Sequence, residues 1–424
     1  MASSPRTNGR RTVAVIGGGA VGVATASFLL RDGHDVVLIE RGGIGEGASF
    51  GNAGCLNPSS VVPMSMPGTL AKVPGYLIDP LGPLSIRWRY LPTLAPWLAR
   101  FVRAGTRARV EAQARALKPL LYDSYGAWLP LVRHAGAEGL ILRQGHLVVY
   151  RTEQDFAGDA LGYQLRRDNG ITFDVLREDE LWQFEPSISH DYTIGVLFQQ
   201  NGHTVNPNRL VRTVAEAFQR DGGRILAAEA KGFLREGATL RGIETDAGAI
   251  PADAAVVAAG AHSRRLATSL GDDVPLDTER GYHVLIADPE TAPRLPILDA
   301  SAKFVSTPME TGLRLAGTVE FAGLDAPPNW QRADYLLTLG RRLFPGLAAH
   351  YPEGRVSRWM GFRPSMPDSL PVIGRASQCP DVAYAFGHGH VGLAAGARTG
   401  QAAADLIAGR APAFDLTPFA PTRF

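Results

Sequence analysis

Residues 12–40 read TVAVIGGGAVGVATASFLLRDGHDVVLIE, and this stretch decides the fold of the chain. It opens with an apolar run, residues 12–16, that has the length and composition of a buried parallel strand. Residues 20–31 have the composition of a helix, and residues 36–39 form a second apolar run with Glu40 at its tip. The pattern therefore predicts a strand, a helix and a second parallel strand, the unit from which doubly wound sheets are built.

Three glycines, Gly17, Gly19 and Gly22, join the first strand to the helix as G-x-G-x-x-G. In such a unit the first glycine makes the tight turn, the second lets the backbone approach a pyrophosphate, and the third lets the helix pack closely on the strand. Phosphates then bind at the positive N-terminal end of the helix. Glu40 is placed to accept hydrogen bonds from a ribose, and its charge disfavours a 2′-phosphate. The stretch predicts a dinucleotide site, the alternative being a βαβ turn without a ligand.

The composition of the whole chain limits the other possibilities. Its 424 residues exceed one hydrophobic core and suggest two domains. A net charge of +2 gives no indication of nucleic-acid binding. Only Cys55 and Cys379 are present, so neither a disulfide framework nor a metal site is expected, and a reducing compartment is favoured. Residues 1–11 lack the apolar core of a signal peptide, and no run of about twenty apolar residues predicts a membrane span.

Two segments of the first quarter allow more than one interpretation. Residues 41–54, RGGIGEGASFGNAG, form a glycine-rich loop that either passes close to a cofactor or is a flexible surface loop. Residues 80–110 contain no acidic residue and place arginines among aromatic side chains. Pro92 and Pro96 are expected to break this second segment into short helical pieces. It is either a helical cap over the core or a surface that rests on anionic lipid.

The remaining chain alternates between two kinds of pattern. Residues 145–198 and 279–318 contain strands without the strand–helix alternation of the N-terminus, which predicts a mixed or antiparallel sheet. Residues 206–221 predict a helix with Asn206 as its N-cap, and residues 252–261 predict a strand that returns to the doubly wound domain. Near the C-terminus, GFRPSMPDSLPVIG (361–374) carries one arginine, and AYAFGHGHVG (383–392) is a strand that enters a glycine-rich turn.

Together these motifs resemble the FAD-dependent amino-acid oxidase and dehydrogenase family, which includes D-amino-acid oxidase, glycine oxidase and the bacterial D-amino-acid dehydrogenases. Five segments match the motifs of this family, in the same order, along nearly the whole chain: residues 13–40, SFGNAG, VVAAGAHS, residues 361–374 and GHGHVGL. The SFGNAG and PLSIRWRYLPTLAPWLARF stretches are most similar to the bacterial dehydrogenase branch. The resemblance implies an α/β fold with two domains. A Rossmann-type FAD-binding domain is expected in three discontinuous segments, 1–85, 206–272 and 361–424. An α+β substrate domain with a mixed or antiparallel sheet is expected in residues 86–205 and 273–360.

The resemblance also implies noncovalent FAD as the cofactor and a set of residues around it. Cys55 is expected only to line the pocket, because relatives that attach flavin through cysteine use a different region of the chain. The residues expected to bind FAD come from the nucleotide turn, the following loop, the second half of the Rossmann sheet and the C-terminal turn, where backbone N–H groups and a helix N-terminus would stabilise charge on the flavin. They are Gly17, Gly19, Ala20, Val21, Gly22, Glu40, Arg41, Ser49, Asn52, Ala53, Ala259, Gly260, Gly387, Gly389, His390, Val391, Gly392 and Leu393.

On the substrate side, the chemistry needs a cation for the carboxylate so that Cα is fixed beneath flavin N5. Arg363 is the candidate, because a guanidinium binds a carboxylate through two hydrogen bonds. A structural ion pair is the alternative. Tyr282 is predicted as a hydroxyl donor to the same carboxylate or as a core residue, and His283 and His388 as contacts of substrate or flavin or as scaffold residues. A neutral amine can drive hydride transfer from Cα to N5 without a general base, which gives an imine that water hydrolyses.

These expectations describe oxidation of D-amino acids or of related cyclic or N-substituted amino acids, with electrons passing to a quinone or another carrier. There are three alternatives. The first is an oxygen-using oxidase of secondary amines or of glycine-like substrates, including iminodiacids. The others are a flavoprotein subunit that needs partner chains and an NAD-binding oxidoreductase. The expected location is the cytoplasm, with peripheral contact at the inner face of the plasma membrane as a further possibility. No nucleic-acid partner is expected.

Overall fold

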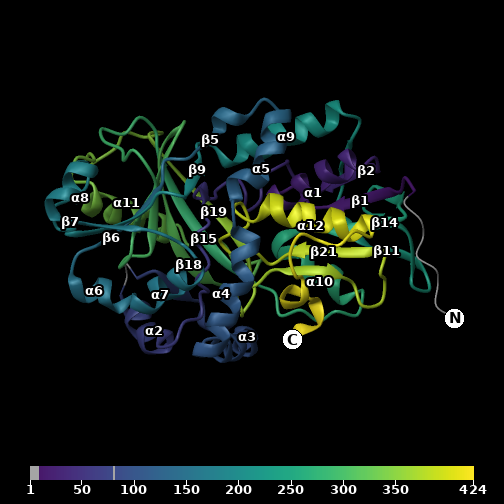
Figure 1. The fold of residues 1–424 in the computed structure, drawn as a ribbon, viewed down its shortest axis with the longest axis horizontal. Helices are drawn as coiled ribbons and strands as arrows, with labels where there is room; N and C mark the ends of the chain where they lie inside the picture. The colour runs from purple at the N-terminus through teal and green to yellow at the C-terminus, as the bar shows by residue number, and fades with distance from the viewer. Residues whose placement is uncertain (1–8, 80–81) are drawn as a thin grey trace.

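The computed structural model describes residues 9–79 and 82–424, and these form two sheet-centred halves (Figure 1). The half around β1, β14, α1 and α12 lies at the right of the view, and the half around β6, β15, β18 and α11 lies at the left. Residues 1–8 of the polar N-terminus, and Pro80 and Leu81 of the arginine-rich segment, lie outside the described residues. No helix in the described part of the chain is long and apolar enough to cross a membrane.

The first half is built on a six-stranded sheet in the order β10-β2-β1-β14-β21-β20, parallel except for the pairing of β20 with β21. Its central strands are buried on both faces, as a parallel sheet requires. The strands are β1 (Thr12–Ile16), β2 (Asp35–Glu40), β10 (Arg224–Ala227), β14 (Ala254–Val257), β20 (Val372–Arg375) and β21 (Val382–Phe386).

Alternate residues of β1 pack into different cores. Val13 and Val15 face a cluster formed with helices α1, α5, α9 and α12, whereas Ala14 and Ile16 face a cluster formed with α10 and a three-stranded meander. The meander comprises β11 (Ala230–Glu236), β12 (Thr239–Thr245) and β13 (Gly248–Pro251). The helices are α1 (Ala20–Arg31), α5 (Ser124–His134), α9 (Pro207–Arg220), α10 (Ser263–Thr268) and α12 (Gly396–Ala408). The predicted N-cap is confirmed, since the Asn206 side chain accepts a hydrogen bond from the Arg209 N–H.

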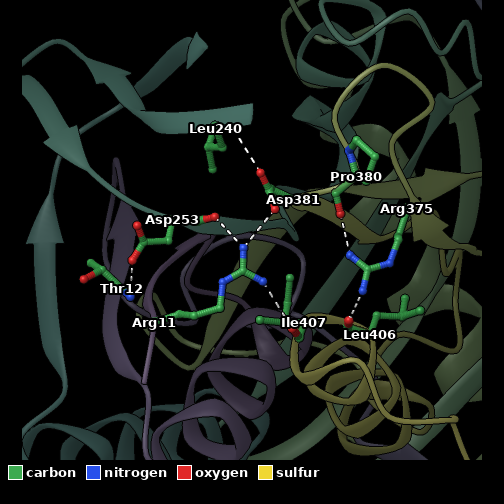
Figure 2. Close-up of polar contacts among 9 residues, drawn as sticks. All are labelled: Arg11, Thr12, Leu240, Asp253, Arg375, Pro380, Asp381, Leu406 and Ile407. Atoms are coloured by element: carbon green, nitrogen blue, oxygen red, sulfur yellow. Dashed lines mark hydrogen bonds and ion pairs between the residues drawn. The ribbon is translucent and has the colours of Figure 1, made fainter. Parts of the chain in front are cut away.

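Arginine side chains connect the segments near the end of this sheet at which β1 begins (Figure 2). Arg11 donates to the carbonyl of Asp253 at 2.6 Å and to the Asp381 carboxylate at 2.9 Å, and thus joins the chain just before β1, β14 and β21. The Asp253 carboxylate accepts from the Thr12 N–H. Arg375 reaches the carbonyls of Pro380 and Leu406 in the same region. Side chains therefore connect the segments at the amino ends of these strands.

The second half is a nine-stranded sheet in the order β19-β15-β18-β17-β16-β6-β8-β7, with β4 paired to β18. It is mostly antiparallel, with two parallel pairs, β16 with β6 and β18 with β4, which matches the predicted mixed sheet. Its strands are β4 (Leu84–Ile86), β6 (His146–Tyr150), β7 (Asp174–Arg177), β8 (Ile194–Phe198), β15 (Asp277–Ile286), β16 (Ile297–Asp299), β17 (Phe304–Met309), β18 (Gly312–Phe321) and β19 (Val356–Ser365).

One face of this sheet packs on α11 (Gln331–Leu343), and the other faces a large cavity. α8 (Glu178–Phe184) packs in the same core as α11. The other α-helices of this part of the chain are α2 (Thr69–Ile78), α3 (Leu91–Ala104), α4 (Arg107–Leu121), α6 (Glu153–Gly158) and α7 (Ala160–Asp168). A small sheet of β3 (Cys55–Leu56), β9 (Gly202–Thr204) and β5 (Ile141–Leu142) connects the halves. The domain boundary expected at residue 361 falls within β19, and the division into domains stays a prediction.

The prediction that prolines break residues 80–110 into short pieces is wrong for the main helix. α3 runs through both Pro92 and Pro96 as one helix of 14 residues. Pro92 occupies the first turn, where no N–H partner is needed, and Pro96 removes only one early backbone hydrogen bond. Packing of Leu94 and Trp97 against Phe321 holds the helix in place.

Candidate functional site

A cavity of about 2000 Å³ runs from the carboxyl ends of the Rossmann strands to the inner face of the nine-stranded sheet. Sixteen of the eighteen residues predicted to bind FAD line it: Gly17, Gly19, Ala20, Val21, Glu40, Arg41, Ser49, Asn52, Ala53, Ala259, Gly260, Gly389, His390, Val391, Gly392 and Leu393. The other two, Gly22 and Gly387, do not line it. Segments far apart in the sequence thus meet in one cavity, as the ordered motifs predict.

The nucleotide turn has no room for side chains. Gly17 has a φ of +111°, and a Cβ there would lie 2.4 Å from the Ala258 carbonyl oxygen. A Cβ on Gly22 would lie 1.8 Å from the Gly17 carbonyl oxygen. The strand, the turn and α1 are therefore packed at a spacing that only glycine permits, which is the close packing that the motif predicts.

The N-terminus of α1 opens on the cavity with donors available. Gly19 is its N-cap and supplies no side-chain cap, and the Ala20 N–H donates to Ser49 Oγ at 3.0 Å. The first N–H groups of a helix have no acceptor within the helix, so they suit the phosphates of a nucleotide. This end of the cavity fits a dinucleotide cofactor.

Glu40 is held at the tip of β2 by backbone donors. Its Oε2 accepts from the Gly18 N–H at 2.6 Å and its Oε1 from the Gly42 N–H at 2.8 Å. Beside it, Arg41 donates to His262 Nε2 at 2.6 Å, and burial lowers the pKa of His262, with the Arg41 charge adding to the effect. The carboxylate therefore has a fixed position on the cavity wall, where a ribose would be bound.

The loop at residues 49–55 is fastened to the other half of the protein by Arg314. This guanidinium on β18 donates to the carbonyls of Phe50 at 3.2 Å and Asn52 at 2.6 Å. Burial lowers the pKa of Arg314 to about 10. Asn52 Oδ1 accepts from the Gly54 N–H, and the Ala53 carbonyl accepts from Thr307 Oγ1. Sequence reasoning missed Arg314, although a charge between the apolar residues Leu313 and Leu315 was a usable signal.

The C-terminal turn, residues 387–393, is shaped by glycines and one buried histidine. Gly387 and Gly389 have φ values of +86° and +54°, and the Gly389 N–H donates to the Pro364 carbonyl at 2.7 Å. His388 Nε2 pairs with Thr399 Oγ1 at 2.9 Å, and burial lowers the pKa of His388 to about 3. His388 therefore fixes the turn against α12, and its predicted contact with substrate stays a prediction.

Arg363 lies where the cavity meets the large sheet. Its Nη1 donates to the Thr318 carbonyl at 3.0 Å, and among the residues that the structure describes no carboxylate lies within 4.0 Å of it. Burial lowers its pKa, and the charge of Glu279, its neighbour in register on β15, opposes that effect. The structural ion pair considered as an alternative is thus not formed here, and the guanidinium keeps donors for an anionic ligand.

Two backbone features make space for Arg363. A Cβ on Gly281 would lie 2.3 Å from Arg363 Nη2, so the guanidinium rests directly on this glycine. Thr318 has a φ of +58° at a register shift in β18, and this bulge turns its carbonyl toward Arg363. A non-glycine residue with positive φ is strained, and such strain is concentrated at functional sites. Neither residue was singled out from the sequence, because both roles depend on strand register.

Tyr282 and His283 project to opposite faces of β15. Tyr282 lines the cavity, although its ring also packs in the core that faces α11. Its hydroxyl donates to Glu320 at 2.5 Å and accepts from the Asn329 N–H. Its one proton thus has another acceptor, and donation to a substrate carboxylate stays a prediction. His283 stacks on Trp359, pairs with the Gly51 carbonyl at 3.2 Å and does not line the cavity.

His390 and Cys55 border the cavity without a charge at neutral pH. His390 has no hydrogen-bond partner among the described residues, and burial, with a contribution from Arg363, lowers its pKa to about 4. Burial raises the pKa of the Cys55 thiol to about 12, and its Sγ lies 3.9 Å from His146 Nδ1. Neither group therefore adds a positive charge that would compete with Arg363 for an anion.

Known proteins share this fold and sequence over nearly the whole chain. The family described as FAD dependent oxidoreductase matches residues 12–406. A D-amino-acid oxidase of Bradyrhizobium diazoefficiens is 47% identical over 417 residues, 98% of this chain and 99% of that protein. D-amino acid dehydrogenase 2 of Ralstonia nicotianae is 32% identical over 97% of this chain and 100% of its own length.

Solved structures add the same architecture at lower identity. Glycine oxidase from Bacillus cereus superposes with a TM-score of 0.75 at 20% identity and covers 98% of this chain and 99% of its own. Iminodiacetate oxidase from Chelativorans sp. superposes with a TM-score of 0.71 at 20% identity, over 96% and 98% of the two chains. The motifs, the cavity and the sequence similarity lead to one conclusion: the chain belongs to the FAD-dependent oxidoreductase family, and FAD is its cofactor.

Proposed function

We propose that this enzyme oxidises the Cα–N bond of D-amino acids or of related cyclic or N-substituted amino acids. The observation that carries the proposal is Arg363, a guanidinium on the cavity wall whose only acceptors among the described residues are the carbonyls of Gly317 and Thr318. A carboxylate is the ligand that such a group binds best. Two relatives above 30% identity are named as an oxidase and a dehydrogenase of D-amino acids, which supports the same substrate class.

The residues proposed to hold FAD divide by the part that they contact. The turn at Gly17, Gly19 and Gly22 and the start of α1 would bind the pyrophosphate, and Glu40 the ribose. The remaining contacts are proposed for Arg41, Ser49, Asn52, Ala53, Ala259, Gly260 and the turn from Gly387 to Leu393. The Cys55 thiol is neutral at physiological pH, which favours noncovalent binding.

FAD, when bound, supplies the oxidant that accepts hydride from Cα. Arg363 binds the substrate carboxylate and so fixes the direction in which the Cα–H bond points. His390 and His388 are neutral, so they add no cation that would compete for the carboxylate or repel a protonated amine. Once the amine has lost its proton, its lone pair assists departure of hydride, and water converts the imine to a 2-oxo acid and ammonia or an amine.

Anaerobic bleaching of the flavin absorbance tests the substrate class. We expect purified holoenzyme to lose its flavin absorbance with several D-amino acids and to keep it with the L-enantiomers. Proline analogues and N-alkyl glycines extend the panel to cyclic and secondary amines. Bleaching by L-amino acids alone, or by no amino acid, would contradict the proposal.

The electron acceptor is proposed to be a quinone or another carrier, with molecular oxygen as the alternative. The relatives named above include both an oxidase and a dehydrogenase. If a quinone or another carrier is the natural acceptor, the enzyme should reduce an artificial quinone or dye faster than it forms peroxide. If peroxide forms faster than the quinone or dye is reduced, the enzyme is an oxidase. This outcome includes an oxidase that acts on secondary amines.

Peripheral contact with an anionic membrane is proposed for the segment that runs from the end of α2 through α3. Ile78 and Trp88 are 81% and 74% exposed there, and the exposed residues Arg89, Arg100 and Arg103 lie nearby in the sequence. Basic and apolar side chains together favour an anionic bilayer surface. Vesicle flotation at low salt with phosphatidylglycerol vesicles tests this, and protein that stays unbound would contradict it.

A further inference from the structure

The cavity extends well beyond Arg363. It continues along the inner face of the nine-stranded sheet, past β18, β17 and β16 to β6, where α6 and α7 close it. In Figure 1 these two helices lie with α2 below β6 and β18. The intervening wall is apolar and includes Ala316, Val305, Leu298 and Val148. The far end, by contrast, carries polar groups for which the reaction has no use.

Arg166 on α7 is the principal group at this far end. Its Nε donates to the Ser59 carbonyl at 3.1 Å, and its guanidinium carbon lies 5.3 Å from the ring centroids of both Tyr163 and Phe198. The rings therefore hold the guanidinium without satisfying its donors. Among the residues that the structure describes, Nη1 and Nη2 have no hydrogen-bond partner, and no carboxylate lies within 4.0 Å.

The nearest acidic group at this end is already engaged. Asp159 accepts from Tyr150 Oη at 2.9 Å and lies 3.8 Å from Lys303 Nζ. Its charge is thus balanced by Lys303, which leaves the positive charge of Arg166 in excess. Burial lowers the pKa of Arg166, which is the expected response of a cation removed from water without a close counter-ion.

A second polar side chain at this end has one unpaired atom. Asn57 is buried on the cavity wall, and its Nδ2 pairs with His146 Nδ1 at 3.2 Å. Its Oδ1 has no hydrogen-bond partner in the part of the chain that the structure describes. With the amide rotated, Oδ1 would accept from His146 Nδ1–H and the NH₂ group would face the cavity. A buried polar group without a partner is rare in native proteins and indicates an absent ligand or water.

The separation of the two arginines limits what can occupy the site. Thr318, which binds Arg363, is on β18, and Phe198, which packs on Arg166, is on β8. The sheet order places these strands four spacings apart, roughly 19 Å at about 4.8 Å for each spacing. A single amino acid with a short acidic side chain does not bridge this distance.

We propose that the far end of the cavity is a second carboxylate site, in which Arg166 binds the distal acid of an extended amino-acid derivative whose α-carboxylate is bound by Arg363. The inference rests on the proposed function and adds its substrate class: amino acids with a long apolar arm that ends in a carboxylate. A separate small monocarboxylate that binds only at Arg166 has the same chemistry, and the test distinguishes the two.

The first experiment measures turnover by holoenzyme with D-2-aminosuberate, its ω-amide and D-alanine. We expect KM for the acid to be at least about tenfold lower than for the amide, because a charged pair replaces a neutral contact. Arg166→Met should reduce this ratio to within about twofold while kcat/KM for D-alanine stays within about twofold. The exposed neighbour provides the control, Arg167→Met, which should retain the full ratio. An unchanged ratio in Arg166→Met would overturn the proposal.

A second experiment does not depend on turnover. Thermal shifts of the holoenzyme are measured with glutarate, suberate, sebacate and the monocarboxylate hexanoate. The longer dicarboxylates should stabilise the protein most, and both Arg166→Met and Arg363→Met should remove that advantage. If hexanoate alone gives the full Arg166-dependent shift, the site takes a separate monocarboxylate and the bridging substrate is wrong. If these shifts hold but no D-amino acid bleaches the flavin, the proposed function fails while the second site stands.

Discussion

The two ends of the cavity are built in different ways. At the nucleotide end the wall is backbone: Gly17 and Gly22 leave no room for a side chain, and even Glu40 is held by main-chain N–H groups. At the substrate end the wall is made of side chains from neighbouring strands, with Arg363 above Gly281 and beside Thr318. The first end is encoded within thirty consecutive residues, whereas the second depends on which residues of distant strands come into register.

This difference predicts distinct consequences when each end is changed. Damage to the nucleotide end should reduce flavin content and stability together, because the same glycines pack the sheet and border the cofactor. Damage to the substrate end should leave a stable yellow protein that binds substrate poorly. The changes below are arranged from the largest expected effect to the smallest.

Arg363→Ala should give the largest loss. Removing one partner of a buried charged pair costs about 2–5 kcal/mol. We expect kcat/KM for the best amino acid to fall by roughly 10²- to 10³-fold, with the flavin spectrum unchanged. Stopped-flow reduction of the bound flavin measures this.

The matched control is Arg358→Ala on the same strand. Arg358 is exposed and forms a surface ion pair with Asp334. Its removal should change kcat/KM by less than about twofold, since exposed pairs contribute little. If Arg363→Ala retains normal flavin reduction, the carboxylate assignment is wrong.

Gly281→Ala tests the space beneath Arg363. The new methyl group would overlap the guanidinium, which must move by about 1 Å, and a misplacement of that size costs up to about 100-fold in rate. We expect kcat/KM to fall by roughly 10- to 100-fold with the flavin content unchanged. Gly139→Ala, at a site with nothing within 4 Å, is the control. Equal kinetics for the two variants would show that Arg363 does not depend on this space.

Gly22→Ala makes the corresponding change at the nucleotide end. Its methyl group would meet a backbone carbonyl rather than a flexible side chain, and overpacking of this kind costs about 3 kcal/mol. We expect a lower midpoint in urea and loss of FAD during purification, measured by the absorbance ratio of flavin to protein. Stable protein with full flavin content would contradict the contrast between the two ends.

The buried histidines predict a loss of stability in acid. Burial lowers the pKa of His388 to about 3, whereas the unfolded chain takes up this proton near pH 6.5. As the pH falls from 7 to 5 the unfolded state gains a proton that the folded state does not bind, so stability falls by about 2 kcal/mol for this group. Urea unfolding of wild type and His388→Gln at both pH values should show a smaller loss in the variant. Equal losses would show that His388 is not buried as a neutral ring.

Tyr282→Phe should have the smallest kinetic effect. Because its one hydroxyl proton is already donated to Glu320, we expect KM to change by less than about threefold and stability to fall by about 1 kcal/mol. Steady-state kinetics and urea unfolding measure the two. A rise in KM similar to that of Arg363→Ala would restore Tyr282 as a carboxylate donor.

The sequence alone was sufficient where local pattern determines structure. The strand, helix and strand of residues 12–40 are confirmed as β1, α1 and β2, because apolar runs, glycine spacing and a turn all agree within one short segment. The cap at Asn206 and the placement of Arg363 on the cavity wall were also predictable.

The substrate end was less predictable for a physical reason. β15 is buried on both faces, so its apolar pattern does not reveal that Gly281 and His283 lie on the face opposite Tyr282. Arg314 and Arg166 act through contacts with residues more than thirty positions away, Asn52 and Phe198. Pro96 was misread because packing of α3 outweighs its poor helix propensity.

The strand order of the Rossmann sheet also has a consequence for synthesis on the ribosome. β1 lies between β2 and β14, and β14 in turn lies between β1 and β21, so the sheet is incomplete until residue 386 has been made. The contact of Arg11 with Asp253 can form once residue 253 has been made, and its contact with Asp381 only near the end of the chain. The nascent chain therefore carries an open edge of β1 until β14 has been made at residue 257, a state in which strands of different molecules can pair. More than half of the chain is synthesised before its first strand has both of its neighbours.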